Sequence, residues 1–211
     1  MRIVIAGGHG KIALLLSRQL ADAGHQPVGL IRSEAQAADL EAAGAASIVL
    51  DLEKATVEQV AAVLAGANAA VFSAGSGGGN AQRTLAVDRD GAILFADAAL
   101  SAGVRRFVLV SAMSTDTFDA ASDDGFQLYL RAKSEADAYV RGTDLDWTIV
   151  RPGALTDEPG RGTVALGTTV DRGSIPRADV ASVVAVLLET GSAVREQFEV
   201  VSGVEPIAQV L

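Results

Sequence analysis

The chain has 211 residues, and it contains no cysteine and only two histidines. The lack of cysteine excludes a disulfide framework, thiolate catalysis and a cysteine-ligated metal. His9 and His25 have no pattern of carboxylates around them, so we expect no metal site. A chain without cysteine is compatible with a reducing compartment, and we expect this protein in the cytoplasm.

Basic residues, long apolar runs and aromatic side chains are also scarce. The 17 basic against 26 acidic residues give a net charge of -9, without the basic cluster that a nucleic-acid partner requires. The apolar run Val180–Leu188 is far too short to cross a membrane, and we expect no signal peptide before the first strand. We therefore expect a small-molecule substrate, with no nucleic acid and no membrane. The composition leaves open whether the protein is a monomer or a homodimer.

The first residues carry the most informative motif. Arg2–Ala6 is a short, β-branched apolar run typical of a buried strand, and Gly7–Ala13 has the pattern Gly-x-x-Gly-x-x-Ala before apolar residues at helical spacing. In this context the pattern is typical of a dinucleotide site. Gly7 permits a tight turn, Gly10 allows backbone to approach a pyrophosphate, and Ala13 allows close packing. The alternative is that the glycines only let the chain turn from strand to helix and bind no ligand.

The second strand, Pro27–Ile31, ends at the pair Arg32 and Ser33. A carboxylate at this turn would bind the ribose hydroxyls of NAD, whereas the Arg32 guanidinium suits a 2′-phosphate, to which Ser33 could add a contact. NADP is therefore favoured as cofactor, and NAD remains possible. Alternatively, Ser33 and Gln36 form a capping box for the next helix, and Arg32 is a solvated surface residue.

Strands and helices alternate along the rest of the chain. This predicts an α/β fold of the Rossmann type, a doubly wound parallel sheet in three α/β/α layers, as one domain over residues 1–211. A small substrate-side segment is expected around residues 153–176, where Thr163–Leu166 and Gly173–Ile175 are interpreted as a hairpin over the site. Long helices are expected over Ala81–Ala102 and Phe126–Val140.

Candidate ligand contacts follow other strands, at the edge of the sheet where such folds bind ligands. Asp51 and Leu52 follow the third strand and are placed to hold adenine, unless Asp51 merely begins a loop. Ser73–Gly75 follow the fourth strand and begin a glycine run that continues to Gly79. Small residues let backbone pass close to a ligand, although a flexible linker would have the same composition.

Ser111, Tyr129 and Lys133 are the candidate catalytic residues. Tyr129 and Lys133 stand four residues apart, on one face of a predicted helix, and an ammonium at that distance is expected to lower the pKa of the phenol. Tyr129 would then exchange a proton with a substrate oxygen that Ser111 also binds. The polar segment 112–125 is interpreted as a mobile flap or a plain solvated loop. Tyrosine and lysine at this spacing are also common on ordinary amphipathic helices.

Taken in order, these motifs resemble the short-chain dehydrogenase/reductase superfamily, and more narrowly its small atypical NAD(P)-binding, epimerase/dehydratase-like branch. The resemblance extends over nearly the whole chain, through Tyr-x-x-x-Lys and the Arg-Pro-Gly turn at residues 151–153. It implies that the following residues contact the cofactor: Gly7, His9, Gly10, Lys11, Ile12, Arg32, Ser33, Asp51, Leu52, Ser73, Ala74, Gly75, Lys133, Pro152 and Gly153. His9 replaces the usual threonine, and it either touches phosphate or fills the turn.

The expected function is hydride transfer between NADP(H) and a small carbonyl, alcohol or quinone- or flavin-like substrate. Some relatives in this branch bind cofactor without turnover, so an NADP-sensing regulator is the main alternative. A nucleotide-sugar epimerase is less expected, because the segment after Pro152 is small for that substrate.

Overall fold

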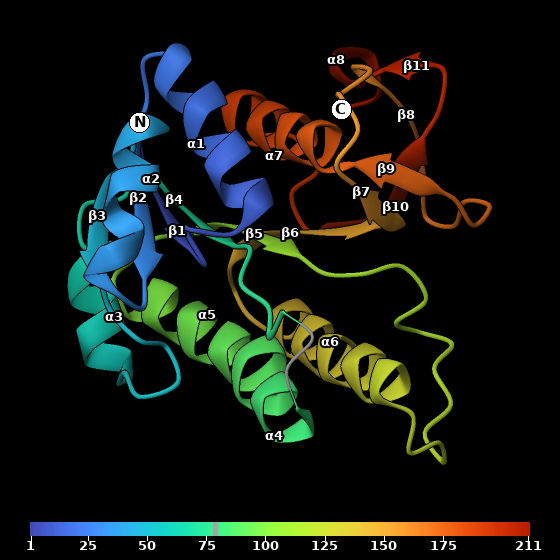
Figure 1. The fold of residues 1–211 in the computed structure, drawn as a ribbon, viewed down its shortest axis with the longest axis horizontal. Coiled ribbons are helices and arrows are strands. Elements are labelled where there is room, and N and C mark those ends of the chain that lie inside the picture. The colour runs from blue at the N-terminus through green and yellow to red at the C-terminus, as the bar shows by residue number, and fades with distance from the viewer. Residues whose placement is uncertain (78–79) are drawn as a thin grey trace.

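A nine-stranded sheet forms the middle layer of the protein, as a computed structural model describes it for residues 1–77 and 80–211 (Figure 1). The strand order within this part of the chain is β11-β8-β10-β6-β5-β4-β1-β2-β3, and β7 pairs with β9 outside the sheet. The strands are β1 Arg2–Ala6, β2 Gln26–Ile31, β3 Ala46–Val49, β4 Ala69–Phe72, β5 Arg106–Val110, β6 Asp146–Pro152, β7 Ala154–Thr156, β8 Thr163–Gly167, β9 Ser174–Pro176, β10 Glu196–Ser202 and β11 Glu205–Pro206.

Helices cover both faces of this sheet. Helices α1 and α7 pack together on one face, and α3, α5 and α6 cover the other (Figure 1). The helices are α1 Lys11–Asp22, α2 Ala37–Ala42, α3 Val57–Leu64, α4 Ala81–Thr84, α5 Ala92–Ser101, α6 Gly125–Arg141, α7 Arg177–Thr190 and α8 Ile207–Val210, with the short 3-10 turn η1 at Glu34–Gln36 and the π-helical segment η2 at Leu85–Gly91. The predicted three-layer, doubly wound α/β fold is confirmed.

Each face of the sheet has its own apolar core. Residues 3–6 of β1 are fully buried between the two helical layers, which explains their uninterrupted apolar sequence. Three of the six phenylalanines meet in the lower layer, where the ring of Phe95 lies 6.1 Å from that of Phe72 and 5.9 Å from that of Phe107. These three rings pack together where β4 and β5 meet α5.

Two predicted elements differ from the structure. The expected hairpin between Thr163–Leu166 and Gly173–Ile175 is wrong, because β8 pairs antiparallel with β10, and β9 pairs parallel with β7. Strand β8 joins the main sheet because Val164 is buried there in register with Ser202, a pairing between distant segments. The expected helix over 81–102 is interrupted by the π-helical segment η2. Gly78 and Gly79 of the predicted glycine run lie outside the described residues.

The strand order reverses beside β1, which pairs with β2 on one side and β4 on the other. The loops after β1 and β4 therefore leave adjacent strands and turn toward opposite halves of the sheet. Ligands of open α/β sheets bind in the crevice that such a reversal creates. The fold places the glycine turn and Ser73–Gly75 side by side at this position.

Candidate active site

The turn after β1 is built by close backbone contacts. Gly7 adopts a φ of 76°, and a Cβ on it would lie 2.6 Å from the Cα of Ala74. Gly10 donates its N–H to the Gly7 carbonyl at 2.8 Å and is the N-cap of α1, with no side chain capping the helix. The first turn of α1 therefore keeps backbone N–H groups for an anion. Gly8, to which the sequence assigned no role, packs on Gly29 of β2, since a Cβ on Gly8 would lie 2.6 Å from the Gly29 Cα.

Three predicted cofactor residues make other contacts. The His9 Nε2 atom lies 2.7 Å from an Asp39 carboxylate oxygen, so the imidazole faces α2. Lys11 forms an ion pair with Asp157 at 2.5 Å. Ser33 accepts a hydrogen bond from the N–H of Ala35 at the start of η1, which confirms the capping role considered for it. The Gln36 side chain accepts from the N–H of residue 32 at 3.0 Å rather than from that of Ser33, so the reciprocal capping box considered for this pair is not formed.

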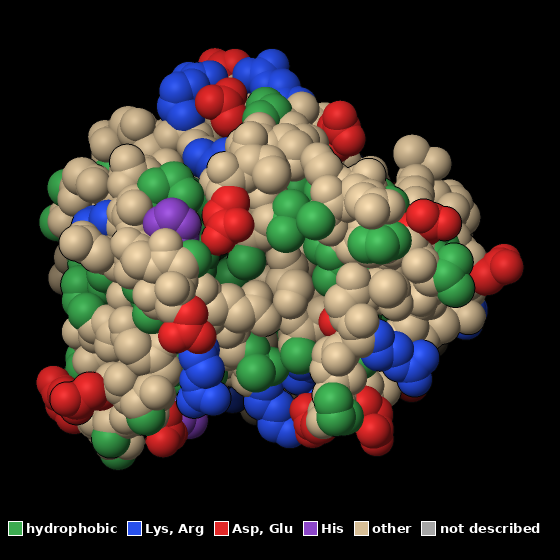
Figure 2. Space-filling model, turned by 90° about the horizontal axis from the view of Figure 1, so that it is seen from above, with side chains coloured by type: hydrophobic (Ala, Val, Ile, Leu, Met, Phe, Trp, Pro, Cys, Tyr) green, Lys and Arg blue, Asp and Glu red, His purple; other side chains and the backbone are tan. Residues whose placement is uncertain are grey.

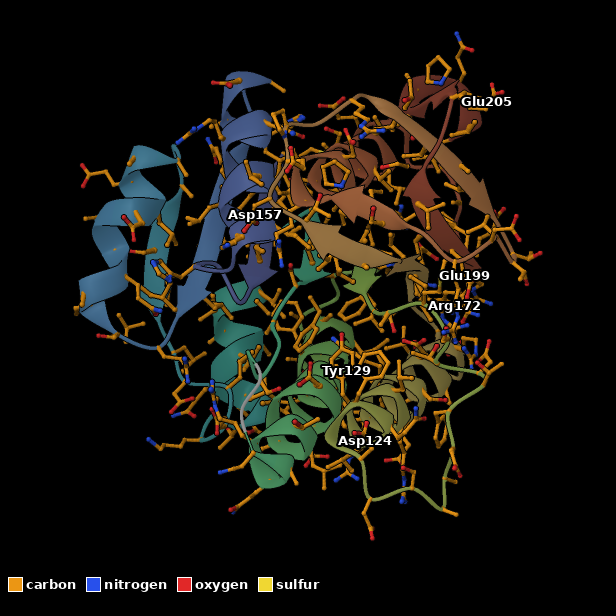
Figure 3. All side chains as sticks on the ribbon, turned by 45° about the vertical axis from the view of Figure 1, so that its right-hand side comes forward. Asp124, Tyr129, Asp157, Arg172, Glu199 and Glu205 are labelled. Atoms are coloured by element: carbon orange, nitrogen blue, oxygen red, sulfur yellow. The ribbon has the colours of Figure 1, made fainter. Side chains whose placement is uncertain are left out.

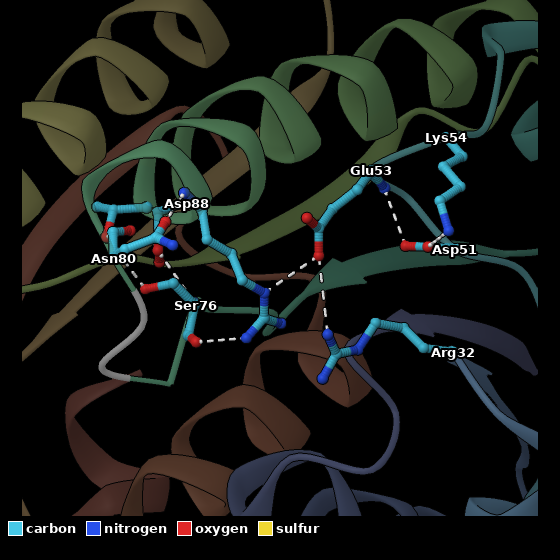
Figure 4. A network of polar contacts seen from close by, with 9 residues as sticks. Arg32, Asp51, Glu53, Lys54, Ser76, Asn80 and Asp88 are labelled. Carbon is cyan, nitrogen blue, oxygen red and sulfur yellow. Dashed lines mark hydrogen bonds and ion pairs between the residues drawn. The ribbon is translucent and has the colours of Figure 1, made fainter.

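A first cavity opens beside the glycine turn and matches the adenosine end of a dinucleotide site. Its lining includes these predicted residues: Gly7, His9, Gly10, Arg32, Asp51, Leu52, Ser73, Ala74 and Gly75. It also includes Glu53 and Arg83, which the sequence interpretation missed. The Nη1 of Arg32 lies 3.7 Å, and the Nε of Arg83 3.2 Å, from the same oxygen of Glu53 (Figure 4).

A second cavity shares Ser73–Gly75 with the first and continues toward α6. It brings together all three predicted catalytic residues, Ser111 directly after β5 and Tyr129 and Lys133 on α6. Tyr129 lies near the start of α6, next to the turn capped by Asp124 (Figure 3). The two cavities thus place the candidate chemistry at the opposite end of one crevice from Arg32.

Lys133 is a buried ammonium held by several partners. Its Nζ donates to the Val110 carbonyl at 3.2 Å and lies 3.4 Å from the Oδ1 of Asp88, which is itself fully buried. Burial alone would lower the pKa of Lys133, but Tyr129, Asp88 and Asp137 outweigh it, so the pKa is raised. Lys133 therefore remains charged, and the Asp88 carboxylate compensates its charge.

The predicted lowering of the Tyr129 pKa is wrong for this arrangement. Burial raises the pKa of Tyr129 by more than the Lys133 ammonium lowers it, and Asp88 and Asp137 raise it further. The Lys133 Nζ lies over the phenol ring, 5.9 Å from its centre. The phenol therefore keeps its proton at neutral pH, which suits a proton donor.

A buried polar cluster lies behind Ser111. Arg151, at the end of β6, donates from its Nε to the Oδ2 of Asp137 at 2.9 Å and holds Asp116 through two further hydrogen bonds. Burial raises the pKa of Asp137, while the positive charges of Arg151 and Lys133 oppose that effect. Asp116 belongs to segment 112–125, so one end of the expected flap is anchored to the buried Arg151, and Thr115 beside it is fully buried.

The Pro152–Gly153 turn packs against β10 and the 173 loop. Gly153 donates to the Val200 carbonyl at 2.9 Å, and a Cβ on it would lie 2.4 Å from the Gly173 carbonyl oxygen. The second cavity is lined instead by Leu155, two residues further along.

Several residues of the site escaped the sequence interpretation, although two left a signal. Asp88 and Asp137 stand at helix positions whose neighbours one turn away, Ala92 and Lys133, are buried. A carboxylate in such a buried stripe needs a partner, and that requirement could have identified both. The sequence gives no sign of a role for Glu53 and Arg83, since both are ordinary surface residue types.

The side chains present fit a bound dinucleotide. The α1 N-terminus lacks a side-chain cap, and the glycine turn leaves no room for a Cβ at Gly7. Among the described residues, Ser111 Oγ is buried without a hydrogen-bond partner, and Ser111 lines the second cavity. Unpartnered buried polar atoms at a cavity surface indicate a polar ligand.

Comparison with known proteins now decides the family. The family model described as NAD(P)H-binding matches residues 7–190. The chain belongs to the NAD(P)H-binding family. A Bacillus subtilis relative, named the uncharacterized sugar epimerase YhfK, is 37% identical over 213 residues, covering 100% of this chain and 99% of the relative.

Solved structures agree with this assignment. One from Bacillus halodurans, provisionally named an NAD-dependent epimerase/dehydratase, is 36% identical with a TM-score of 0.92 and covers 100% of this chain and 98% of its own. The oxidoreductase ylbE from Lactococcus lactis is 29% identical with a TM-score of 0.86, covering 99% and 94%. The predicted relation to the atypical short-chain dehydrogenase/reductase branch is confirmed.

Two further observations concern membranes and metals. Across residues 1–77 and 80–211, no helix has the length and apolar character needed to cross a bilayer. The same residues contain no cluster of three or more potential metal ligands. Figure 2 shows acidic and basic side chains interspersed over one face of the molecule, with no single basic patch there.

Proposed function

We propose that this protein is an NADP(H)-dependent oxidoreductase that reduces a small, uncharged carbonyl compound, with quinone- or flavin-like rings as the preferred substrates. The observation that supports this most is the second cavity, where Ser111, Tyr129 and Lys133 meet at the end of a crevice that begins at the glycine turn. Catalysis needs such a convergence, whereas cofactor binding alone does not.

Two arginines support NADP as the cofactor. Arg32 and Arg83 both line the adenosine-end cavity, and their guanidinium groups converge on one Glu53 oxygen. Paired guanidinium groups suit the two negative charges of a 2′-phosphate. The bound nicotinamide would supply a hydride at the other end of the crevice.

The proton required for carbonyl reduction would come from Tyr129. Its raised pKa keeps the phenol protonated at neutral pH, so it can donate to a substrate oxygen that also accepts from Ser111. One hydride and one proton complete the reduction, and the phenolate regains its proton from solvent. Lys133 would hold the phenolate during turnover by its positive charge.

The lining of the second cavity favours an uncharged ring. Phe126 is 60% exposed, and its ring stacks on that of Tyr129 with a centroid distance of 6.0 Å. Leu155, also exposed, lines the cavity with them. The described lining contains no arginine, and its lysine is buried beside Asp88. A planar ring would stack on Phe126, whereas the pyrophosphate of a nucleotide sugar would find no exposed cation.

A titration of the purified protein with NADP⁺, NADPH, NAD⁺ and NADH tests the cofactor, repeated on Arg32→Ala. We expect binding at micromolar concentrations, a preference for the phosphorylated pair, and loss of that preference in the variant. Oxidation of NADPH with menadione, lumiflavin and UDP-glucose then tests the reaction. Absence of binding by all four nucleotides would refute the proposal, and tight binding without turnover of any acceptor would favour a sensing role.

A further inference from the structure

Glu53 occupies an unusual position for a carboxylate at an expected phosphate site. One of its oxygens, Oε1, lies 3.2 Å from the Arg83 Nε and 3.7 Å from the Arg32 Nη1 (Figure 4). The two arginines come from distant segments, Arg32 after β2 and Arg83 from α4. Glu53 therefore neutralises the same guanidinium groups that a 2′-phosphate would need.

The Glu53 backbone and the Arg83 side chain are held by further contacts. The N–H of Glu53 donates to Asp51 at 3.2 Å, while Arg83 donates from its Nη1 to the Ser76 carbonyl at 2.9 Å. The N–H of Arg83 is capped by Asn80 at 3.0 Å. The Glu53 and Arg83 side chains are each about 30% exposed, at 28% and 30%. The Arg32 side chain is more open, at 54%, so Glu53 and Arg83 form the partly buried part of the cluster.

We propose that Glu53 is an internal competitor of the 2′-phosphate and thereby sets the preference of this protein between NADP and NAD. The inference rests on the proposed function. With NAD bound, Glu53 stays between Arg32 and Arg83. With NADP bound, the phosphate takes its place, and the carboxylate turns toward solvent. Specificity then depends on a repulsive element as well as on attractive ones.

If Glu53 instead bound the ribose hydroxyl groups of the cofactor, removing its charge would affect the other dissociation constant. A carboxylate at the adenosine ribose often accepts hydrogen bonds from its hydroxyl groups and so favours NAD. In that case removing the charge would weaken NADH binding and leave NADPH unchanged. If Glu53 competes with the 2′-phosphate, removing its charge strengthens NADPH binding and leaves NADH binding nearly unchanged. The two roles therefore differ in which dissociation constant moves.

The test is a fluorescence titration of the full-length protein with NADPH and with NADH, comparing wild type with Glu53→Gln. We expect NADPH to bind roughly tenfold more tightly in the variant and NADH to change by less than about twofold, because only the phosphate competes for the arginines. An unchanged NADPH dissociation constant, or a loss confined to NADH, would overturn the proposal. If neither nucleotide binds wild type, the proposed function fails first.

Two controls separate competition from a general effect of charge. Glu34→Gln removes an exposed carboxylate two residues from Arg32, on η1 and outside the lining of the first cavity, so both dissociation constants should change little. In an Arg83→Gln background the gain from Glu53→Gln should shrink, since contacting residues are not additive. An equal gain in both backgrounds would show that Glu53 does not act through Arg83, and a matching gain in Glu34→Gln would reduce the effect to net charge.

Discussion

The Asp88 carboxylate lies 3.4 Å from the Lys133 ammonium, and both groups are buried. Asp88 also accepts the N–H of Ser76 at 3.0 Å, which ties the loop after β4 to α6 through η2. A π-helical turn is a common feature of functional sites. The pair leaves the site without the net positive charge that an isolated lysine would give it.

Asp88→Asn should shift the pH dependence of reduction. Reduction needs the Tyr129 phenol, so turnover falls as the pH rises through its pKa. Asp88 raises that pKa, and its loss also leaves the lowering effect of Lys133 uncompensated. The alkaline limb of the kcat profile should therefore move to lower pH. Asp90→Asn, at an exposed residue paired with Arg89, is the control and should leave the profile in place. If the alkaline limb of the Asp88→Asn profile stayed at the wild-type pH, Asp88 would not be raising the pKa of Tyr129.

Gly7→Ala should destabilise the protein more than Gly24→Ala does. Both glycines have positive φ angles, 76° and 78°, so both alanines incur a backbone cost of about 1–2 kcal/mol. Only at Gly7 would the Cβ meet another backbone, that of Ala74, whereas nothing lies within 4 Å at Gly24. The overlap should add roughly 1–3 kcal/mol to the loss in unfolding free energy, measured in urea. Equal losses would show that the turn relaxes freely.

The Arg151 cluster should show a graded response. Arg151→Met leaves Asp137 buried without its cation and should cost about 3–5 kcal/mol in unfolding free energy. Asp116→Asn should cost less than about 1 kcal/mol, because the Asp116 side chain is 59% exposed. Urea denaturation of the three proteins measures both. The reverse order would mean that the loop contact, rather than the buried pair, stabilises this region.

The sequence was sufficient for the fold because its signals are local. Buried parallel strands such as β1 are continuous apolar runs, and the glycine turn follows within two residues. Tyr129 and Lys133 were also singled out from a local pattern, because residues four positions apart share one face of a helix. Ser111 was found because it directly follows a strand, at the edge of the sheet where ligands bind.

What the sequence could not supply depends on pairing between distant segments. The pairing of β8 with β10 and the meeting of Glu53 with Arg83 join residues 30 or more positions apart. The sign of the Tyr129 pKa shift was wrong because burial, which no spacing of residues indicates, outweighs the lysine. The contact of His9 with Asp39 likewise depends on where α2 packs.

Phe126→Ala should weaken ring-shaped acceptors selectively. Its exposed ring stacks on Tyr129 at the mouth of the second cavity, so its loss removes a stacking surface. We expect the KM for menadione to rise roughly tenfold, from lost aromatic contact and buried area. The NADPH dissociation constant and the KM for a small aliphatic carbonyl should change little. A uniform rise for all acceptors would show that Phe126 supports the fold of α6 rather than the substrate.

The most direct test of the central claim is the rate at which bound NADPH is oxidised by menadione in a single turnover, compared between wild type and Tyr129→Phe. The variant keeps the ring that stacks on Phe126 but has no proton to donate. We expect the rate to fall by about 10²- to 10⁴-fold with the NADPH dissociation constant unchanged. An undiminished rate in a variant that still binds NADPH would contradict the assignment of Tyr129 as the proton donor.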